Sequence, residues 1–313
     1  METYIGIDIG GTRIKIGAII NDELMDSKIV DVESKNKFES MIESVEVAID
    51  EICANLNISA KEVAGIGVTF PGIVDAKQSK VIATNDKYDS AKAFDWKKWV
   101  AEKYNNCSFY INNDAKLAAV GEWKYGAGRG TTDMAMITLG TGVGSGVISD
   151  NRMLGGKHGQ AGNLGGHLTV KFDGDTCSCG NKGCIEAQAS TDVLERLYKE
   201  YSEGKDSSLA KEEKVDFKAI FTHAAEGDLV ASELRDYCMN VWGAGVVNHI
   251  HAYDPEVVVL GGGIMNSKDV ILPHIKGYVD AYAWTPWNDV KIVEASMLDN
   301  AAVFGAVYMC KNQ

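Results

Sequence analysis

The sequence predicts an α/β protein made of two similar lobes. Strand-like apolar runs alternate with helical segments along the 313 residues, and this length favours two domains at roughly 100–200 residues each. Two segments also share one layout: YIGIDIGGTRIKIGAII at 4–20 and MAMITLGTGVGSGVIS at 134–149 both read as strand, tight glycine turn and strand. We interpret them as an internal repeat that gives two lobes facing each other across a cleft. Two unrelated hairpins are the alternative.

In the first half of the chain, a strand over 4–9 leads into the turn Gly10-Gly11-Thr12. A helix is expected over 38–56, because its apolar residues recur every three or four positions and form one stripe. These residues are Phe38, Ile42, Val45, Ile49, Ile52 and Leu56. A short apolar strand over 109–111 is followed by a helix-like stretch over 116–123.

The second half repeats this alternation. Its expected elements are a strand over 134–139, a helix over 230–252, a buried strand over 256–260 and a short helix over 301–310. The long helix is expected to end at Asp254-Pro255, because proline stops helices. Residues 203–216 are charged and rich in serine without an apolar period, which indicates a mobile loop or a frayed helix end.

The composition excludes several classes of protein. Hydrophobic residues make up 45% and charged residues 24% of the chain, which excludes a wholly disordered protein. The net charge of −13 would repel a polyanion, so we expect no nucleic-acid partner. The start of the chain lacks the pattern of a signal peptide, and the apolar stretch 134–149 is too short and too rich in glycine to span a membrane. We therefore expect a soluble, cytoplasmic protein with no membrane partner.

Three glycine clusters directly follow strand-like runs and indicate a nucleotide. Glycine has no Cβ, so backbone N–H groups in such turns can approach phosphate oxygens closely. In the first cluster, Asp8 can hold Mg²⁺ directly or through water, and the Thr12 hydroxyl can hold a phosphate oxygen. The second cluster spans 140–144, and the third, Gly261-Gly262-Gly263, suits a base or ribose packed on bare backbone. No Rossmann or Walker motif occurs in a fitting place.

Three of the seven cysteines are crowded into the pattern C-x-C-x₄-C, at Cys177, Cys179 and Cys184. Thiolates prefer Zn²⁺ or an iron–sulfur cluster, and structural zinc readily takes three cysteines and one histidine. We expect His167 as the fourth ligand, with His158 as the competitor. Such a closed site has no open position, so its zinc would be structural. Buried or reactive thiols without a metal are the alternative.

The strand over 109–111 is followed by Asn112-Asn113-Asp114, which places a carboxylate where a strand ends. A carboxylate at the mouth of a cleft can accept a hydroxyl proton, and a helix N-cap is the alternative role. Glu186 comes two residues after Cys184, so a metal-bound loop would hold it near the same cleft. The alternative for Glu186 is an ordinary solvated side chain.

Taken together, these motifs resemble the ROK family of sugar kinases, which includes bacterial glucokinases and N-acetylmannosamine kinases. The resemblance covers nearly the whole chain. It rests on D-I-G-G-T, P-G, N-D-A, L-G-T-G-V-G, C-x-C-G-x-x-G-C-x-E and a late G-G-G in combination. It implies the two-lobed, actin-like ATPase (RNase H-like) fold with an interlobe cleft. We expect an N-terminal lobe over 1–115 and a C-terminal lobe with the zinc loop over 116–313, with a helix near 300–312 returning to the first lobe.

The resemblance also implies ATP-dependent phosphorylation of a hexose or hexose derivative at its 6-hydroxyl, with Asp114 as general base and Mg²⁺ and structural Zn²⁺ bound. It further implies a homodimer. The residues implied to bind ATP are Asp8, Gly10, Gly11, Thr12, Lys15, Gly140, Thr141, Gly142, Gly261, Gly262 and Gly263. Those implied to bind the sugar are Pro71, Gly72, Asn113, Asp114, Asn163, His167 and Glu186. The implied zinc ligands are His167, Cys177, Cys179 and Cys184.

Two positions depart from the family pattern. The family carries E-x-G-H before the cysteines and binds the sugar with that glutamate, whereas here Asn163 takes its place and one glycine is inserted. Asparagine both donates and accepts hydrogen bonds, so the pattern of recognised sugar hydroxyls can differ from that of glucose. Lys116 stands where many members carry asparagine.

Two other functions compete with the kinase. The family includes sugar-responsive repressors, but because the first strand begins by residue 4 and the net charge disfavours DNA, we expect no N-terminal DNA-binding domain. The missing glutamate motivates a catalytically silent sugar-binding protein. Retention of Asn113, Asp114 and both phosphate turns argues against that alternative.

Overall fold

The computed structural model describes residues 2–32, 38–84, 88–105, 107–287 and 289–313. The chain forms two compact units. Unit 1 is assembled from three stretches, Met1–Gly130, Met153–Asn163 and Met297–Gln313. Unit 2 contains the remaining two stretches, Thr131–Arg152 and Leu164–Ser296.

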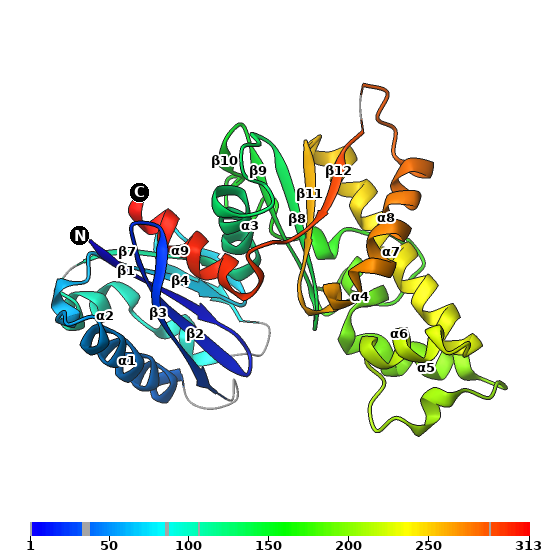
Figure 1. The fold of residues 1–313 in the computed structure, drawn as a ribbon, viewed down its shortest axis with the longest axis horizontal. Helices are drawn as coiled ribbons and strands as arrows, with labels where there is room; N and C mark the ends of the chain where they lie inside the picture. The colour runs from blue at the N-terminus through cyan, green and yellow to red at the C-terminus, as the bar shows by residue number, and fades with distance from the viewer. Residues whose placement is uncertain (1, 33–37, 85–87, 106, 288) are drawn as a thin grey trace. The chain divides into compact units, whose positions relative to one another are not determined.

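The sheet of unit 1 has the strand order β3-β2-β1-β4-β7 (Figure 1). Its strands are β1 (Thr3–Ile9), β2 (Arg13–Ile20), β3 (Glu23–Asp31), β4 (Gly65–Phe70) and β7 (Ser108–Asn113). Strands β1, β2 and β3 form an antiparallel meander, while β4 lies parallel to both β1 and β7. A small separate sheet pairs β5 (Ile73–Asp75) with β6 (Lys80–Ala83).

The second five-stranded sheet has the order β10-β9-β8-β11-β12. Its strands are β8 (Met134–Leu139), β9 (Val143–Ser149), β10 (Arg152–Met153), β11 (Val257–Gly261) and β12 (Lys291–Glu294). As in unit 1, a glycine turn joins an antiparallel pair, β8 and β9, and two parallel strands follow on the other side of β8. The shared strand order agrees with an internal repeat and not with two unrelated hairpins.

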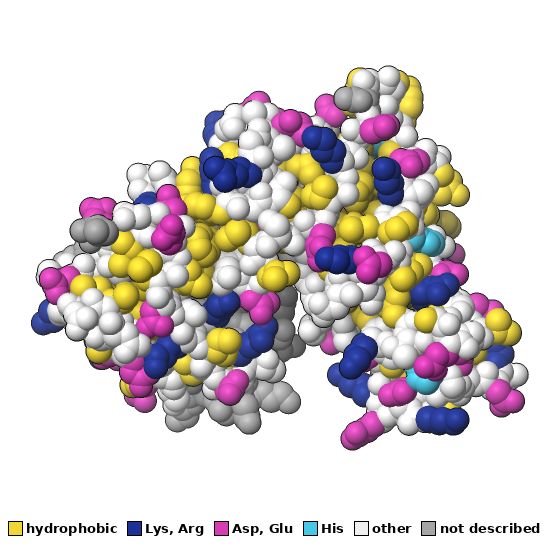
Figure 2. Space-filling model, viewed as in Figure 1, with side chains coloured by type: hydrophobic (Ala, Val, Ile, Leu, Met, Phe, Trp, Pro, Cys, Tyr) yellow, Lys and Arg dark blue, Asp and Glu magenta, His cyan; other side chains and the backbone are white. Residues whose placement is uncertain are grey.

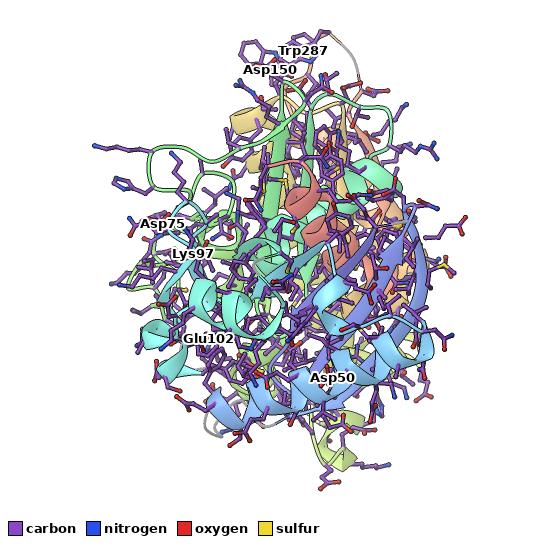
Figure 3. All side chains as sticks on the ribbon, turned by 90° about the vertical axis from the view of Figure 1, so that its left-hand side faces the viewer. Asp50, Asp75, Lys97, Glu102, Asp150 and Trp287 are labelled. Atoms are coloured by element: carbon purple, nitrogen blue, oxygen red, sulfur yellow. The ribbon has the colours of Figure 1, made fainter. Side chains whose placement is uncertain are left out.

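Helices cover both faces of the sheet in unit 1. Side chains alternate along β1, so Ile5, Ile7 and Ile9 face one side and pack with the apolar stripe of α1 (Phe38–Asn55). The opposite side meets α9 (Ala301–Lys311), which contacts β1 and β4. The outward faces of α1 and of α2 (Trp96–Lys103) carry charged side chains, including Asp50, Lys97 and Glu102 (Figure 3).

Helix α3 (Asp114–Tyr125) crosses α9 with backbone against backbone. A Cβ on Gly305 would lie only 1.8 Å from the carbonyl oxygen of Leu117, and one on Gly121 only 2.0 Å from that of Ala301. Only glycine fits at such a separation. This packing includes α3 in unit 1, so the border between the units falls after Gly130 and not at the expected residue 115.

A buried carboxylate near the end of α3 fixes two further parts of unit 1. Glu122 is fully buried, its Oε1 accepts a hydrogen bond of 2.7 Å from the N–H of Met297, and its Oε2 accepts one of 2.8 Å from that of Ala127. Ala127 lies three residues before Gly130, where the first stretch of unit 1 ends, and Met297 is the first residue of its last stretch. Glu122 therefore anchors two chain segments that lead to unit 2.

The remaining helices belong mainly to unit 2. They are α4 (Ile185–Ala189), α5 (Leu194–Ser202), α6 (Phe217–Ala225), α7 (Leu229–Tyr253) and α8 (Lys268–Tyr282). Short 3₁₀ helices in the two units occupy Ala60–Glu62, Asp89–Ala93, Gly165–His167, Thr191–Val193, Ser208–Lys211, Gly263–Ser267 and Leu298–Asn300. Helix α7 matches the expected long helix closely, and Asp254 ends it in a left-handed conformation.

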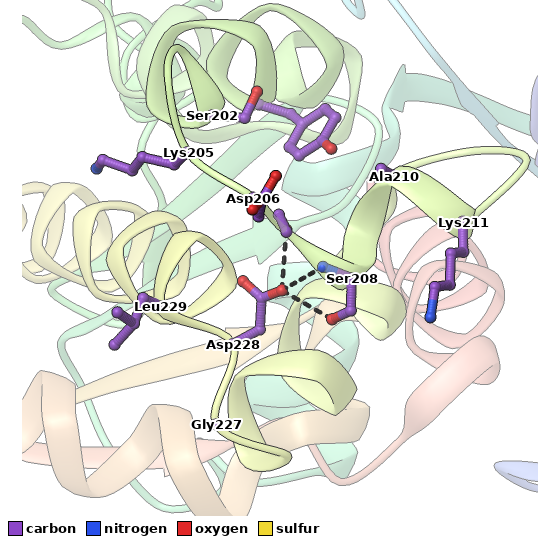
Figure 4. Close-up of a pocket in the computed structure, with 11 residues that line it drawn as sticks. Ser202, Lys205, Asp206, Ser208, Ala210, Lys211, Gly227, Asp228 and Leu229 are labelled. Atoms are coloured by element: carbon purple, nitrogen blue, oxygen red, sulfur yellow. Dashed lines mark hydrogen bonds between the residues drawn. The ribbon is translucent and has the colours of Figure 1, made fainter.

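The expected loop over 203–216 contains a 3₁₀ helix at Ser208–Lys211 that is bonded to Asp228, the N-cap of α7. The Asp228 carboxylate accepts hydrogen bonds from Ser207 Oγ (2.9 Å) and from Ser208 N and Oγ (2.6 and 2.7 Å; Figure 4). It also accepts one from Ala231 N (2.9 Å). Partial burial opposes the charge of Asp228, but these bonds outweigh it and lower its pKa to about 2.

Within the described residues, no helix is long and apolar enough to cross a membrane. On the face drawn in Figure 2, acidic and basic side chains are interspersed over the surface.

A pair of Gly→Ala substitutions tests the close crossing of α3 and α9. Gly305→Ala places a Cβ against the Leu117 carbonyl, so we expect the free energy of unfolding to fall by about 1–3 kcal/mol or more. In the matched control Gly277→Ala, within α8, the new Cβ meets no atom within 4 Å, and helix propensity predicts a gain of up to about 1 kcal/mol. Chemical denaturation measures both. Equal effects of the two substitutions would contradict the crossing.

The hydrogen bonds of Asp228 predict an acid-sensitive contribution to stability. Because its folded-state pKa lies below the ordinary 3.8, this contribution is present above pH about 4 and is lost as the pH falls toward 2. Asp228→Asn should therefore lower the melting temperature at pH 6, and the gap to the unmodified protein should narrow as the pH falls from about 4 toward 2. Thermal melts over this pH range measure the gap. A gap that does not change with pH would show that the charge of Asp228 contributes nothing.

Candidate functional site

The first glycine turn joins β1 to β2, and the backbone hydrogen bonds of its first residue, Gly10, fix its conformation. The N–H of Gly10 donates to the carbonyl of Arg13 (3.0 Å), and the carbonyl of Gly10 accepts from the Tyr88 hydroxyl (2.7 Å). The hydrogen bonds among the described residues leave the N–H groups of Gly11 and Thr12 unused. The turn therefore offers donors suited to an anion, as the sequence suggested.

Asp8 lies one residue before the end of β1, between side chains of the two neighbouring strands, β2 and β4. Thr69, in register on β4, donates its hydroxyl hydrogen bond to Asp8 Oδ1, and Lys15 lies opposite Asp8 on β2. Desolvation by burial raises the pKa of Asp8, although Thr69 and Lys15 both oppose that rise. A carboxylate whose charge is poorly solvated gains from a nearby cation, and its hard oxygens fit Mg²⁺.

The second glycine turn, between β8 and β9, has the same construction. The N–H of Gly140 donates to the carbonyl of Gly142 (3.0 Å). The carbonyl of Gly140 accepts from both the hydroxyl (3.0 Å) and the N–H (3.1 Å) of Thr191. In each unit, a hydroxyl from a distant segment thus holds the carbonyl of the first turn glycine, which fixes the direction of the turn.

The third glycine cluster follows β11 and lies against the second turn within unit 2. Gly262 adopts a left-handed φ of 92°, and a Cβ there would lie 2.2 Å from the carbonyl oxygen of Leu139, the residue before Gly140. Gly263 begins a 3₁₀ helix, and a Cβ on it would meet nothing within 4 Å. The structure therefore brings the second and third clusters together and leaves bare backbone at Gly263.

The segment Asn113-Asp114 stands where β7 passes into α3. Asn113 is the N-cap: its Oδ1 accepts from the N–H of Lys116 (3.1 Å), and its Nδ2 donates to the carbonyl of Gly72 (3.1 Å). The capping role considered for Asp114 thus belongs to Asn113. Asp114 is the first helical residue, is half-buried, and accepts from the N–H of Ala115 (2.8 Å). The predicted sugar segments 71–72 and 113–114 therefore meet within unit 1.

The predicted sugar residues are divided between the units. Pro71, Gly72, Asn113, Asp114 and Asn163 lie in unit 1, and His167 and Glu186 lie in unit 2. Asn163 is buried at the end of the stretch Met153–Asn163, where its Nδ2 donates to Gln160 Oε1 (3.0 Å).

Glu186 belongs to α4 and is bonded to the second glycine turn. Its Oε2 accepts from the N–H of Val143 (2.9 Å), and a Cβ on Gly142 would lie 2.4 Å from the same oxygen. Glu186 is therefore not an ordinary solvated glutamate. Its carboxylate lies beside a residue predicted to bind ATP.

The four predicted zinc ligands converge. One donor atom from each of His167, Cys177, Cys179 and Cys184 lies within 4.8 Å of the others. The sulfurs of Cys179 and Cys184 are 3.7 Å apart, and Cys177 Sγ is 3.5 Å from His167 Nδ1. Tetrahedral zinc with Zn–S and Zn–N bonds of about 2.3 and 2.05 Å requires S···S and S···N separations of about 3.8 and 3.6 Å. The donor set and these two separations fit zinc, and His167 rather than His158 completes the cluster.

A pocket of about 610 Å³ lies elsewhere in unit 2, between α5, the 3₁₀ helix at Ser208–Lys211 and the start of α7 (Figure 4). Its charged lining residues include Lys205, Asp206, Lys211 and Asp228. None of the predicted ATP, sugar or zinc residues lines it.

Several side chains that shape the site were not predicted from the sequence. Thr69 could have been suspected, because it precedes the Pro71-Gly72 motif by two residues on a strand-like run. Tyr88 and Thr191 carry no local signal, because each acts on a glycine far away in the sequence. Glu122 lies in the predicted helical stretch, and of its two backbone partners Ala127 is near in the sequence while Met297 is far away.

Comparison with known proteins extends these observations over the whole chain. A model of the ROK family matches residues 4–313. A glucokinase from Thermotoga maritima is 28% identical over 99% of this chain and 97% of its own length. A glucokinase from Halalkalibacterium halodurans is 31% identical over 99% of this chain and 95% of its own length. A xylose repressor from Caldicellulosiruptor bescii is 29% identical over 98% of this chain and 77% of its own length.

Solved structures of ROK proteins have the same fold as this chain. The ROK hexokinase from Thermus thermophilus superposes with a TM-score of 0.80 at 27% identity, covering 98% of this chain and 97% of that one. A ROK family glucokinase from Streptomyces griseus, solved in complex with glucose and AMPPNP, gives 0.75 at 28% identity over 99% and 100% of the two chains. These similarities confirm the predicted α/β, actin-like fold class. On the family model and the relatives together, the chain belongs to the ROK family.

Proposed function

We propose that the protein is a kinase that transfers the γ-phosphoryl group of ATP to a hexose or hexose derivative. The similarity to the Streptomyces griseus glucokinase carries this proposal, because that protein was solved with glucose and an ATP analogue and matches 99% of this chain. The two glucokinase relatives, which match over nearly their full lengths, add support.

The three glycine clusters would bind ATP. The unused N–H groups of Gly11 and Thr12 and the bare backbone at Gly263 are suited to phosphate oxygens and to a base or ribose. Asp8 would hold Mg²⁺, which when bound would neutralise part of the phosphate charge. Lys15, opposite Asp8, adds a positive charge to the same end of β1.

Asp114 would act as the general base. In the proposed reaction, its carboxylate accepts the proton of the 6-hydroxyl while that oxygen forms a bond to the γ-phosphorus and the bond to the ADP oxygen breaks. Asn113 is engaged as an N-cap and by Gly72, so it would hold Asp114 in place and could offer the sugar its second amide hydrogen and the second lone pair of Oδ1.

The choice of sugar would depend on Asn163. The amide of Asn163 replaces a carboxylate of the family pattern, and one of its N–H bonds already goes to Gln160. The side chain can therefore present an acceptor and a donor to the sugar, where glutamate presents acceptors only. We propose that the preferred substrate differs from glucose in the hydroxyls that this residue contacts.

Zinc would be structural. Bound by His167, Cys177, Cys179 and Cys184, it would fix Cys184, the N-cap of α4. Glu186 follows two residues later and accepts from Val143. The metal would thus hold the carboxylate of Glu186 at the second glycine turn.

A sugar-responsive regulator is the second candidate, because xylose repressors are among the relatives. A sugar-binding protein without catalysis is the third. A coupled assay for ADP release over a panel of hexoses and hexose derivatives separates the kinase from both. The homodimer implied by the resemblance and the cytoplasmic location expected from the sequence stay predictions.

The proposed base predicts a specific loss. Asp114→Asn keeps the size of the side chain but cannot take a proton, so we expect kcat to fall by about 10²–10⁴-fold with the fold intact. Asp50→Asn, an exposed change on α1, is the matched control and should leave kcat unchanged. The ADP-release assay measures both. Near-normal turnover in Asp114→Asn would remove Asp114 from this role.

The metal cluster predicts about one zinc ion per purified chain. Cys177→Ser and Cys179→Ser should lose the metal and lower the melting temperature, whereas Cys107→Ser, outside the cluster, should keep it. Mass-spectrometric metal analysis gives the content. If active protein prepared without chelator holds no zinc, the cluster is a set of thiols only.

A further inference from the structure

The most unusual buried group in unit 1 is the ammonium of Lys116. This residue lies on α3, two positions after Asp114, and is only 1% exposed. Lysine is almost never fully buried unless its charge is compensated. The described residues offer Lys116 no ion pair, and desolvation by burial lowers its pKa to about 8.

Backbone carbonyls take the place of a counter-ion. The Nζ of Lys116 donates to the carbonyls of Leu154 (2.8 Å), Gly159 (2.7 Å) and Ala161 (3.3 Å). An ammonium has three N–H donors, so all of them are used. The three carbonyls belong to one stretch, Met153–Asn163, which enters unit 1 between two stretches of unit 2.

Besides its bonds to Lys116, this stretch is held by neutral hydrogen bonds: the N–H of Ala161 donates to the Gly155 carbonyl (3.1 Å), and Gln160 Nε2 donates to the carbonyls of Val74 (3.4 Å) and His158 (3.3 Å). Beyond Met153 it contains no helix or strand, and Gly156, Gly159 and Gly162 all adopt left-handed φ angles of 65–75°. Glycines lose more conformational freedom on ordering than any other residue. The stretch ends at Asn163, whose N–H and Nδ2 both donate to Gln160. Lys116 Nζ is the charged group that ties the stretch to α3 at three points, Leu154, Gly159 and Ala161.

Lys116 also connects this stretch to the other sugar segments. Its own N–H donates to Asn113 Oδ1, and Asn113 Nδ2 donates to the Gly72 carbonyl. A continuous hydrogen-bonded path thus runs from Gly72 through Asn113 and Lys116 to the stretch that ends at Asn163. All of its members lie in unit 1.

We propose that Lys116 is a positioning residue for sugar recognition, which orders residues 154–161 and thereby holds Asn163 in place to bind the substrate. Lys116 does not touch the sugar; it acts through Asn163. The inference rests on the proposed role of Asn163 in a sugar kinase.

The test compares Lys116→Met with Lys124→Met. Both residues lie on α3, but the ammonium of Lys124 lies over the Trp123 ring, 3.3 Å from its centroid, so its loss leaves the stretch untouched. If Lys116→Met leaves about a tenth of molecules with an ordered stretch, the KM for the sugar rises about tenfold, whereas the KM for ATP and kcat at saturating sugar change less than about threefold. Lys124→Met should change none of these values.

Two further measurements separate positioning from general damage. Hydrogen exchange of the sugar-free protein should show faster exchange of the amides at 154–163 in Lys116→Met and not in Lys124→Met. Because Lys116 acts through Asn163, adding Lys116→Met to Asn163→Ala should change the sugar KM far less than it does in the unmodified protein. If Lys116→Met does not fold, Lys116→Gln, which keeps two N–H donors, replaces it.

The outcomes distinguish the two proposals. If the unmodified protein phosphorylates no sugar in the panel, the kinase proposal fails, while the exchange measurement still decides whether Lys116 orders the stretch. Unchanged exchange in Lys116→Met overturns the ordering. Faster exchange with an unchanged sugar KM, or additive effects with Asn163→Ala, overturns the role in sugar recognition.

Discussion

The close approach of α9 to its neighbours is the constraint on which unit 1 depends. Gly305 brings α9 against the backbone of α3 at Leu117, and Gly67 brings it against the sheet, where a Cβ would lie 2.3 Å from the carbonyl of Ala306. Helix α9 is therefore packed on both sides with no room for larger residues. Because α9 fixes α3, it also fixes the start of α3, where β7 ends and where Asn113 and Asp114 lie.

Helix α3 buries two ionisable side chains, Lys116 and Glu122. Lys116 donates to backbone carbonyls of the stretch 154–161, and Glu122 accepts from the backbone N–H groups of Ala127 and Met297. None of these backbone groups belongs to a helix or strand. An uncompensated buried charge is costly, but several charge-assisted hydrogen bonds can offset that cost. The helix thus orders nearby chain segments with its charges, while its first residue, Asp114, is the proposed catalytic group. One rigid element serves both purposes.

The sequence revealed those features of the site that depend on local pattern. The glycine turns, the spacing of Cys177, Cys179 and Cys184, and the passage from strand to helix at Asn113 are all visible within ten residues. Features that depend on contacts between distant segments were not visible. The pairing of Asp8 with Thr69 requires the register of β1 on β4, and the carbonyls bound by Lys116 lie about forty residues downstream, as tertiary rather than local partners. The packing of α3 on α9 was not visible for the same reason, and the units of the structure divide after Gly130 where the sequence suggested residue 115.

The assembly of unit 1 from separate stretches bears on how the protein is made. The ribosome produces β1, β4 and α3 early, but α9 emerges only after all of unit 2 has been synthesised. Until then, the surfaces that Val303, Phe304 and Val307 cover remain in contact with water, which makes the nascent chain a natural client for chaperones. A chain that ends shortly before α9 would keep every stretch of unit 2 but would lack the residues that cover Ile19 in unit 1.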